Sequence, residues 1–313
     1  RGLKQDMEFD TKILENNDVI IDGQFIGKIN GLKLELDLKK GALETDIKSL
    51  KKAARQGVAP ELEKRIGIII DTGLVELQND SKIYWNKAKI GRLTPGKDYL
   101  NPNFELIVDD ILEQNQKIRL TKFLEKWLKN KIETTLKSLI DLKDLKEKNS
   151  SIKALAYQLY ENNGVLKRDQ VTEYLKNLAQ NERKILRELG VKFGRYHVFL
   201  HRLIKPEAVS LRTLLWKNYH QKYFDLQPPT FGLNFIDNKN QKNKNFMLLC
   251  GFEKFESFFV RIDILERLFM QIINSKSDKE IKMIPEMLNL LGCNKDNFKK
   301  LLLNMGYRVI EKN

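Results

Sequence analysis

The sequence predicts a mainly helical α+β protein, on three observations. Two similar hairpin-like segments lie near the N-terminus, and apolar residues recur at three- and four-residue spacing over most of the chain from residue 118 onward. The chain has 313 residues, 42% of them hydrophobic, which is enough for one large core or several smaller ones. No run of eighteen apolar residues is present, so a membrane span is not expected.

The first hairpin is predicted over residues 15–36. Val19 to Ile21 lead into Asp22-Gly23, and an Asp-Gly pair between apolar runs is a strong hairpin signal. Residues 79–100 repeat this pattern at an offset of 64, because the segment 26–29 matches the segment 90–93. We therefore expect two related hairpins that form a small paired β-element.

Helices are expected where apolar residues recur at helical spacing: 43–56, 60–70, 118–140, 151–161, 168–189, 206–219, 263–271, 281–291 and 295–305. Pro60 suits the first turn of its helix, and Gly190 suits the end of the helix 168–189. The last two helices, with Gly292 between them, resemble a helix-turn-helix, and a strand is predicted after them over 307–310.

The remaining segments are predicted as strands and connections. Residues 102–112 form a connection with one short strand or turn, 191–204 a strand or hairpin, 225–245 a loop or linker and 246–261 a strand pair. These boundaries suggest three domains: a paired hairpin and helix domain (1–111), a basic helical domain with a strand (112–224), and a strand pair with the helix-turn-helix-like segment (225–313). Because the sequence begins with Arg1, we expect a fragment boundary there.

The net charge of +14 is concentrated in the middle of the chain. Residues 112–220 carry 23 Lys and Arg against 12 Asp and Glu, which accounts for +11 of that excess. A basic domain of this kind favours a polyanionic partner, with nucleic acid first and an anionic membrane surface second. The alternative is a solvated helical surface without a partner.

Two basic features indicate nucleic-acid binding. On an ideal helix over 168–189, the side chains of Lys176, Arg183, Lys184 and Arg187 form one cationic stripe. The following segment interleaves cations with aromatic residues, a combination that suits a single strand, because cations bind phosphates and aromatic rings stack on unpaired bases. Its candidate contacts are Lys192, Arg195, Tyr196, His197, Arg202, Lys205, Arg212 and Lys217.

No motif predicts catalysis. Gly91 to Lys97 has the spacing of a phosphate-binding loop, but Asp98 follows where such a loop has Ser or Thr, so we expect a turn and no ATP hydrolysis. His197 and His201 have no acidic third ligand in a metal-binding pattern. Cys250 and Cys293 have no metal-binding spacing and suit a reducing cytoplasm. We therefore expect no metal and no cofactor in this segment.

The run Leu189–Pro206, followed by Leu211–Trp216, resembles a signature of large alphaproteobacterial helicases that are relatives of the mitochondrial degradosome RNA helicase. Further stretches agree in order along nearly the whole chain: Trp85, Ile90–Gly96, Ala154–Leu159, Gly164–Leu166, Val260–Leu265, Leu291–Cys293 and Met305–Arg308. The chain differs at His201, where the family pattern often has proline.

The resemblance implies that this chain is the non-motor half of a superfamily-two helicase. It implies RecA-like motor domains upstream, with ATP and Mg bound there, and ATP-driven movement on RNA or DNA. We expect this half to guide the single strand, with Lys28 and Arg92 of the two hairpins as further contacts and a nuclease as a candidate partner. The rival hypotheses are a protein-interaction scaffold that docks a nuclease or ribosomal partner, and an independent enzyme.

Overall fold

The computed structural model describes residues 10–38, 44–145, 150–237, 243–277, 280–308 and 310. The chain is mixed α+β, as predicted. It divides into two compact units, which are described separately: unit 1 is Arg1–Lys131 with Leu214–Lys222, and unit 2 is Ile132–Thr213 with Tyr223–Asn313. In the described residues, no helix is long and apolar enough to cross a membrane.

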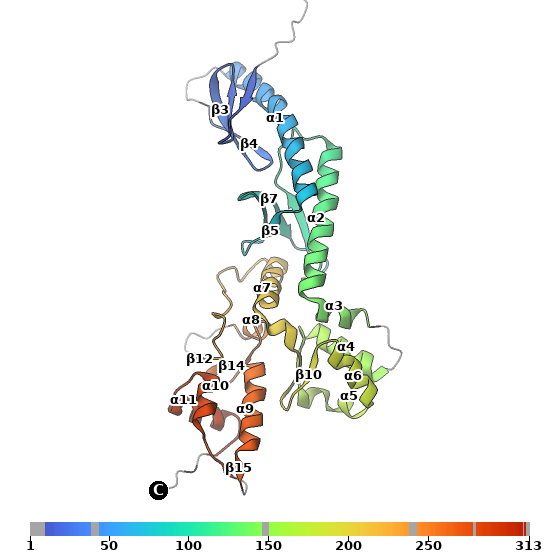
Figure 1. Cartoon of the computed structure of the whole chain (residues 1–313), viewed down its shortest axis with the longest axis vertical. Helices are drawn as coiled ribbons and strands as arrows, with labels where there is room; N and C mark the ends of the chain where they lie inside the picture. The colour runs from blue at the N-terminus through green and yellow to red at the C-terminus, as the bar shows by residue number, and fades with distance from the viewer. Residues whose placement is uncertain are drawn as a thin grey trace, which may run out of the picture. The chain divides into compact units, whose positions relative to one another are not determined.

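Unit 1 contains two four-stranded antiparallel sheets in which each strand pairs with the next in sequence (Figure 1). The first sheet consists of β1 (Thr11–Ile13), β2 (Asp18–Ile21), β3 (Gln24–Asn30) and β4 (Lys33–Leu36). The second consists of β5 (Val75–Leu77), β6 (Lys82–Trp85), β7 (Ala88–Thr94) and β8 (Asn103–Leu106). Each predicted hairpin is therefore the centre of a larger sheet.

The two sheets are structural repeats at the predicted offset of 64. The pairing Asp18 with Lys28 is repeated as Lys82 with Arg92, and a register shift follows Val19 in one sheet and Ile83 in the other. The central turn residues have positive φ in both copies: Asp22 (48°) and Gly23 (78°), and Asn86 (46°) and Lys87 (66°). Both hairpins thus use the two left-handed residues that a tight two-residue turn requires.

A single long helix, α1 (Glu44–Thr72), connects the sheets and contacts the first of them (Figure 1). The prediction of two helices was wrong, because Pro60 lies inside α1 and not in a first turn. Proline removes one helical hydrogen bond and is unfavourable at such a position. An uninterrupted buried stripe offsets this cost, since Ala54, Val58, Leu62 and Ile66 are all fully buried.

Polar side chains fix α1 and the chain after β8 to the first sheet. The guanidinium of Arg65 in α1 donates to the carbonyl of Gly31 (2.9 Å) and to the side chain of Asn17 (2.7 Å). Asp109, which is 2% exposed, accepts from the backbone N–H of Leu34 (3.0 Å). Both sheets therefore belong to one folded unit.

Two helices contain residues of both units, α2 (Gln114–Thr135) and α7 (Pro206–His220). The first part of unit 2 continues with α3 (Lys137–Lys143), α4 (Ser150–Glu161), β9 (Val165–Lys167), the 3-10 turn η1 (Arg168–Val171), α5 (Thr172–Lys176), α6 (Gln180–Glu188), β10 (Val191–Phe193), β11 (His197–Leu200) and η2 (His201–Ile204). Its strands form one sheet in the order β10-β11-β9. The strand or hairpin expected over 191–204 is a hairpin that ends at Leu200, and the last four residues form η2.

The single helix predicted over 168–189 is wrong. The chain leaves the helix after α5 and restarts at α6, where the carboxylate of Glu182 accepts from the backbone N–H of Ala179 (3.0 Å). This local cap stabilises a new helix start in the middle of an uninterrupted apolar pattern. As a consequence, Lys176 and Arg187 do not lie on one helical stripe.

The second part of unit 2 contains β12 (Phe235–Asp237), α8 (Lys244–Leu249), β13 (Phe252–Lys254), β14 (Phe258–Arg261), α9 (Ile262–Asn274), β15 (Lys276–Ser277), β16 (Glu280–Ile281), α10 (Pro285–Leu291) and α11 (Lys295–Asn304). The strand pair expected over 246–261 begins only at Phe252, because the preceding residues form α8. The described residues after α11 include no strand, and Val309 of the expected strand over 307–310 lies outside them.

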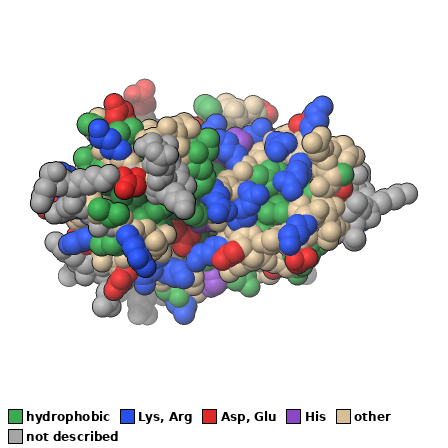
Figure 2. Space-filling view, turned by 90° about the horizontal axis from the view of Figure 1, so that it is seen from below, with side chains coloured by type: hydrophobic (Ala, Val, Ile, Leu, Met, Phe, Trp, Pro, Cys, Tyr) green, Lys and Arg blue, Asp and Glu red, His purple; other side chains and the backbone are tan. Residues whose placement is uncertain are grey.

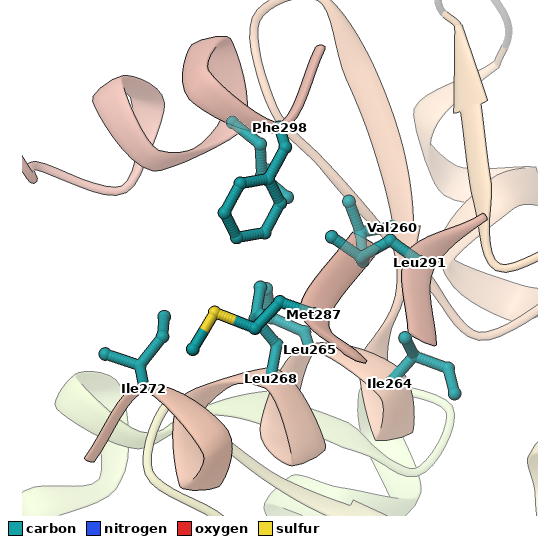
Figure 3. Close-up of a cluster of buried hydrophobic side chains, with 9 residues drawn as sticks. Val260, Ile264, Leu265, Leu268, Ile272, Met287, Leu291 and Phe298 are labelled. Atoms are coloured by element: carbon teal, nitrogen blue, oxygen red, sulfur yellow. The ribbon is translucent and has the colours of Figure 1, made fainter. Parts of the chain in front are cut away.

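The last three helices of unit 2 share one core (Figure 3). Leu265 and Leu268 of α9 face Met287 of α10 and Phe298 of α11, and all four side chains are almost fully buried. The pair α10 and α11 follows the predicted helix-turn-helix-like pattern, and Gly292 between these two helices has a φ of 69°. The core fixes α9, whose opposite face contributes to the candidate site.

Candidate nucleic-acid interface

Unit 2 contains a cavity of about 740 Å³, here called the cationic cleft, whose lining includes Lys192 and Phe193 of β10, Lys205 after η2, and residues of α9. The lining cations are Arg187, Lys192, Lys205, Arg261 and Arg267. Two acids, Asp263 and Glu266, also line it. Residues from two distant parts of the chain therefore converge on one basic surface.

The first wall comes from the α6–β10 segment. Lys192 is exposed on β10, opposite the buried Phe199 in the register with β11. The exposed Arg187 of α6 places its guanidinium over the ring of Phe193, 5.5 Å from the ring centroid. A cation–π contact of this kind orients the guanidinium and leaves its N–H groups available to a ligand.

The second wall comes from α9, on which Asp263, Glu266, Arg267 and Met270 recur at helical spacing and all line the cleft. Asp263 neutralises Arg261, since both guanidinium contacts to its carboxylate measure 2.6 Å. Arg267 is exposed, and no described carboxylate pairs with it. Arg267 is thus the cation that α9 offers to a ligand.

Four of the cleft cations are without an ion-pair partner in the part of the chain that the structure describes: Arg187, Lys192, Lys205 and Arg267. Figure 2 shows Lys and Arg side chains gathered around the middle of the face seen from below. Unpaired cations that line one cavity create a positive potential that attracts a polyanion. The cleft also has apolar walls, which include Phe193, Ile204 and Met270.

His201 lines the same cleft as a neutral group. Its Nδ1 lies 2.8 Å from the carbonyl oxygen of Gly190. Burial and the nearby cations Lys192, Arg202 and Lys205 lower its pKa, and they outweigh the opposing effect of the carbonyl. His201 therefore adds no positive charge at neutral pH and acts as a hydrogen-bonding side chain.

The turn between β10 and β11 is held by a carboxylate. Glu266 accepts from the backbone N–H groups of Arg195 (2.6 Å), Tyr196 (2.9 Å) and His197 (2.9 Å). Successive N–H groups that point at one site form an anion-binding concavity, here occupied by a side chain of the same unit. The turn, which follows the first wall of the cleft, is therefore fixed to α9, which forms the second wall.

His197 is buried between two carboxylates. Its Nε2 lies 2.7 Å from Glu253 and its Nδ1 lies 3.3 Å from Glu266. Burial lowers the pKa of His197, but the hydrogen bonds to Glu253 and Glu266 outweigh it and the net shift is upward. Burial raises the pKa of both carboxyl groups, and contacts with His197 reverse this into a net lowering. The three groups form a charged structural cluster.

The structure brings three of the predicted contacts, Arg187, Lys192 and Lys205, together in the cleft. Arg202 is exposed, with its side chain beside Gly190, but it does not line the cleft. Arg195 belongs to the β10–β11 turn, and its side chain lines another cavity, with its guanidinium 5.8 Å from the ring centroid of Phe269. The proposed contact surface is therefore smaller than the sequence pattern indicated.

Four predicted contacts occupy other environments. His197 is 3% exposed, Arg212 1% and Lys217 8%, so we withdraw them as surface contacts. Arg212 donates to the carbonyl oxygens of Leu249 and Asn163. Tyr196 is half-buried, with its ring edge against Phe269 at 5.2 Å. Aromatic and cationic residues at short spacing thus serve partly as core, which the sequence pattern alone does not distinguish.

The remaining predicted contacts lie outside the cleft. Lys176 forms an exposed ion pair with Glu173 (3.7 Å), and Arg183 donates to the carbonyl of Leu175 (2.6 Å). Lys28 and Arg92 occupy equivalent positions in the two sheets of unit 1, each opposite a glutamate in the strand register. Arg92 forms an exposed ion pair with its partner Glu105 (2.6 Å).

The segment with the spacing of a phosphate-binding loop is a turn, as expected. β7 ends at Thr94, and the side chain of Asp98 accepts from the backbone N–H groups of Leu100 (2.9 Å) and Asn101 (3.0 Å). No helix follows before α2, whereas a phosphate-binding loop leads directly into one. In the described ranges, no three His, Cys, Asp or Glu side chains are arranged to hold a metal ion.

Sequence reasoning missed Arg267 as a member of the site. Its segment has little net charge, and Arg267 shares a cavity with Lys192 only because α9 packs beside β10 and β11. The available signal was the recurrence of polar residues at 263, 266 and 267 on the face of α9 opposite its apolar stripe.

No protein-family model matches this chain, and no curated protein or solved structure shows significant similarity to it.

Proposed function

We propose that this chain binds single-stranded nucleic acid through the cationic cleft. The observation that carries the proposal is the convergence of Arg187, Lys192, Lys205 and Arg267 in one cavity without carboxylate partners among the described residues. Phosphate contacts from Lys and Arg supply most of the affinity of sequence-independent binding. Four such cations in one cavity form a phosphate-binding surface, whereas the cations of a solvated helix face would not converge on one point.

The apolar walls of the cleft favour a single strand over a duplex. Phe193, Ile204 and Met270 lie among the cations, and bases in a duplex would hide their faces from these side chains. Unpaired bases expose apolar surfaces that aromatic and aliphatic side chains can contact. We infer that the backbone of the strand contacts the cations while its bases contact the apolar walls.

We further infer the wider role from the resemblance described above. In that role the chain is the accessory region of an ATP-dependent RNA or DNA helicase in the cytoplasm, and it guides a strand leaving RecA-like motor domains. ATP and Mg would bind to those motor domains. A nuclease is the candidate protein partner.

Fluorescence anisotropy with labelled single-stranded RNA, single-stranded DNA and duplex tests the proposal. If the four cations contact phosphates, the slope of log affinity against log salt is about −3, so affinity falls by about 50-fold from 50 to 200 mM salt. The triple variant Lys192→Glu, Lys205→Glu, Arg267→Glu should abolish binding at 150 mM salt. These side chains are exposed, so circular dichroism should remain unchanged.

A matched control separates the cleft from net charge. Lys153, Lys282 and Lys300 are exposed lysines of unit 2 that do not line the cleft. Their triple replacement by glutamate changes the net charge by the same amount and should weaken binding far less than the cleft variant. Equal losses in the two triple variants would show that binding depends on overall charge and not on this site.

The protein-interaction scaffold remains the second candidate, because Phe224 (55%), Phe231 (56%) and Leu233 (48%) are exposed in one connecting segment of unit 2. Exposed apolar side chains close in sequence can anchor a protein partner. If the chain is a scaffold, it should not bind a nucleic-acid strand even at low salt concentration. It also predicts that replacing the three residues with serine abolishes capture of the partner while leaving the fold intact.

A further inference from the structure

A second cavity of about 790 Å³ lies on the other side of the β10–β11 turn and belongs entirely to unit 2. It is here called the aromatic cavity. Its apolar surface comes from Tyr196, Phe255, Leu265 and Met305. These residues lie on the turn itself, between β13 and β14, on α9 and just after α11.

The aromatic residues of this cavity are held in place. The ring of Tyr196 packs edge-to-face on Phe269 at 5.2 Å, and its hydroxyl lies 3.4 Å from that of Tyr307. Burial, followed by the hydrogen bond to Tyr307, raises the pKa of Tyr196, so this side chain is neutral. Phe255 packs against the core that α9, α10 and α11 share, and its backbone N–H donates to the carbonyl oxygen of Phe258 (2.7 Å). Rigid rings of this kind lose little entropy when a planar ligand stacks on them.

The charges of the aromatic cavity differ from those of the cationic cleft. Of its four lining cations, Lys167 lies 3.6 Å from Glu253 and Arg168 donates to the carbonyl of Gly194 (2.7 Å). Arg195, whose guanidinium lies over Phe269, and the exposed Lys254 keep their N–H groups available. The exposed carboxylates of Asp169 and Glu256 also line the cavity. Mixed charge of this kind is unfavourable for a phosphate but suits the polar edge of a base.

The cavity and the cleft share a wall. Gly194 lines the cleft, while Arg195 and Tyr196 of the turn and His197 at the start of β11 line the cavity. On α9, the neighbouring residues Leu265 and Glu266 likewise line the cavity and the cleft respectively. A strand whose backbone lies in the cleft would therefore meet the cavity on the far side of this turn.

We propose that the aromatic cavity binds one unstacked nucleobase of the strand whose phosphates occupy the cationic cleft, and that it prefers a base with an exocyclic amino group. This inference rests on the proposed function. Single-strand-binding proteins hold splayed bases by stacking them on aromatic rings and by hydrogen bonds to their edges. A carboxylate accepts hydrogen bonds and pairs well with the amino group of cytosine, whereas uracil presents a carbonyl oxygen there.

An abasic-site scan tests the base-binding step. Labelled oligocytidine just long enough to span the cleft and the cavity, so that a shift in register loses phosphate contacts, carries one abasic site at successive positions. It should bind about 10-fold more weakly when the gap falls at the nucleotide that enters the cavity. Phe255→Ala should remove that penalty. Phe255→Leu retains most of the buried apolar volume and should also lose the penalty, and a thermal melt of each variant establishes that it is folded.

Two acid-to-alanine pairs test the preference for an amino group. Asp169→Ala with Glu256→Ala should abolish the preference for oligocytidine over oligouridine. The control Glu161→Ala with Glu286→Ala makes the same change of charge at exposed positions of unit 2 outside the cavity, and should keep the preference.

The outcomes separate this inference from the proposed function. Salt-dependent binding that tolerates an abasic site at every position overturns the base-binding cavity and leaves the strand-binding cleft standing. Equal affinity for oligocytidine and oligouridine in the unmodified chain overturns the amino-group preference. A folded chain that binds no oligonucleotide at low salt overturns both.

Discussion

Glu266 binds His197 twice: its carboxylate accepts from the backbone N–H of His197 at 2.9 Å and lies 3.3 Å from the Nδ1 of the same residue. The two residues are 69 positions apart in sequence. This contact attaches the β10–β11 turn to α9, and so it joins the wall that carries Lys192 to the wall that carries Arg267. The geometry of the cleft therefore depends in part on this carboxylate.

Replacing that carboxylate should destabilise unit 2. Glu266→Ala leaves the N–H groups of Arg195, Tyr196 and His197 without their acceptor, and hydrogen bonds to charged groups contribute about 1.5–3 kcal/mol each. Because the turn is exposed or only partly buried, water can replace part of the lost acceptor, and we expect a loss of about 3 kcal/mol in the free energy of unfolding, measured with urea. Glu266→Gln retains one acceptor oxygen and should lose less, and equal losses in the two variants would contradict a role for the carboxylate oxygens.

The charged cluster around His197 predicts a stability maximum in mildly acidic solution. The raised pKa of His197 means that its contribution is complete below its ordinary pKa of 6.5 and is lost as the pH rises through the raised value. The lowered pKa values of Glu253 and Glu266 mean that their contributions are present above 4.5 and are lost as the pH falls.

Urea unfolding between pH 4 and pH 9 measures this dependence. The unmodified chain should lose stability in alkaline solution relative to His197→Gln, whose side chain does not titrate. If the difference between the two proteins is the same at every pH, His197 does not carry the charge that its contacts with Glu253 and Glu266 favour.

Arg212 and Lys205 separate a structural cation from a binding one. Arg212 is 1% exposed and donates to two backbone carbonyls, so Arg212→Ala should reduce the free energy of unfolding by about 3 kcal/mol, because it leaves buried acceptors without donors. Lys205 is exposed, and Lys205→Ala should change stability by less than about 0.5 kcal/mol. Strand binding measured at fixed salt should respond in the opposite order, with a larger loss in the folded Lys205 variant.

The fold of unit 1 was largely predictable because its repeats are encoded locally. Asp22-Gly23 and Asn86-Lys87 select the same tight turn, and the strands on both sides alternate in the same way. The break between α5 and α6 was not predictable from periodicity, because Leu175 in α5 and Leu178 within the break continue the helical spacing and are both buried. The hydrogen bond from the backbone N–H of Ala179 to Glu182 determines where α6 begins. A single capping residue does not change the periodicity of apolar residues from which helices are predicted.

The candidate site was predictable only in part, for a similar reason. Lys192 and Lys205 come from the segment whose charge first indicated nucleic-acid binding. Arg212, by contrast, has the same composition signal but lies inside the protein, and Arg267 enters the cleft through tertiary packing alone. Charge along a sequence indicates the kind of partner, while burial decides which cations can meet it.

Gly194 tests how closely the β10–β11 turn must approach α9. A Cβ atom at this position would lie 2.4 Å from the carboxyl carbon of Glu266, far inside van der Waals contact. Gly194→Ala should therefore displace the carboxylate and destabilise unit 2 by about 1–3 kcal/mol, the usual range for overpacking. Without this carboxylate the β10–β11 turn is no longer fixed to α9, and this turn separates the cationic cleft from the aromatic cavity. The affinity for a single strand should therefore fall in the folded variant.

The matched control is Gly67→Ala in α1, where no atom lies within 4 Å of the added methyl group. Alanine is favoured over glycine inside a helix, so this variant should be more stable by about 0.5–1 kcal/mol. Thermal and urea unfolding of the two single variants measure the contrast. Similar stability changes in both would mean that the turn can move away from Glu266, and the cleft would then lack the rigid wall on which its arrangement of cations depends.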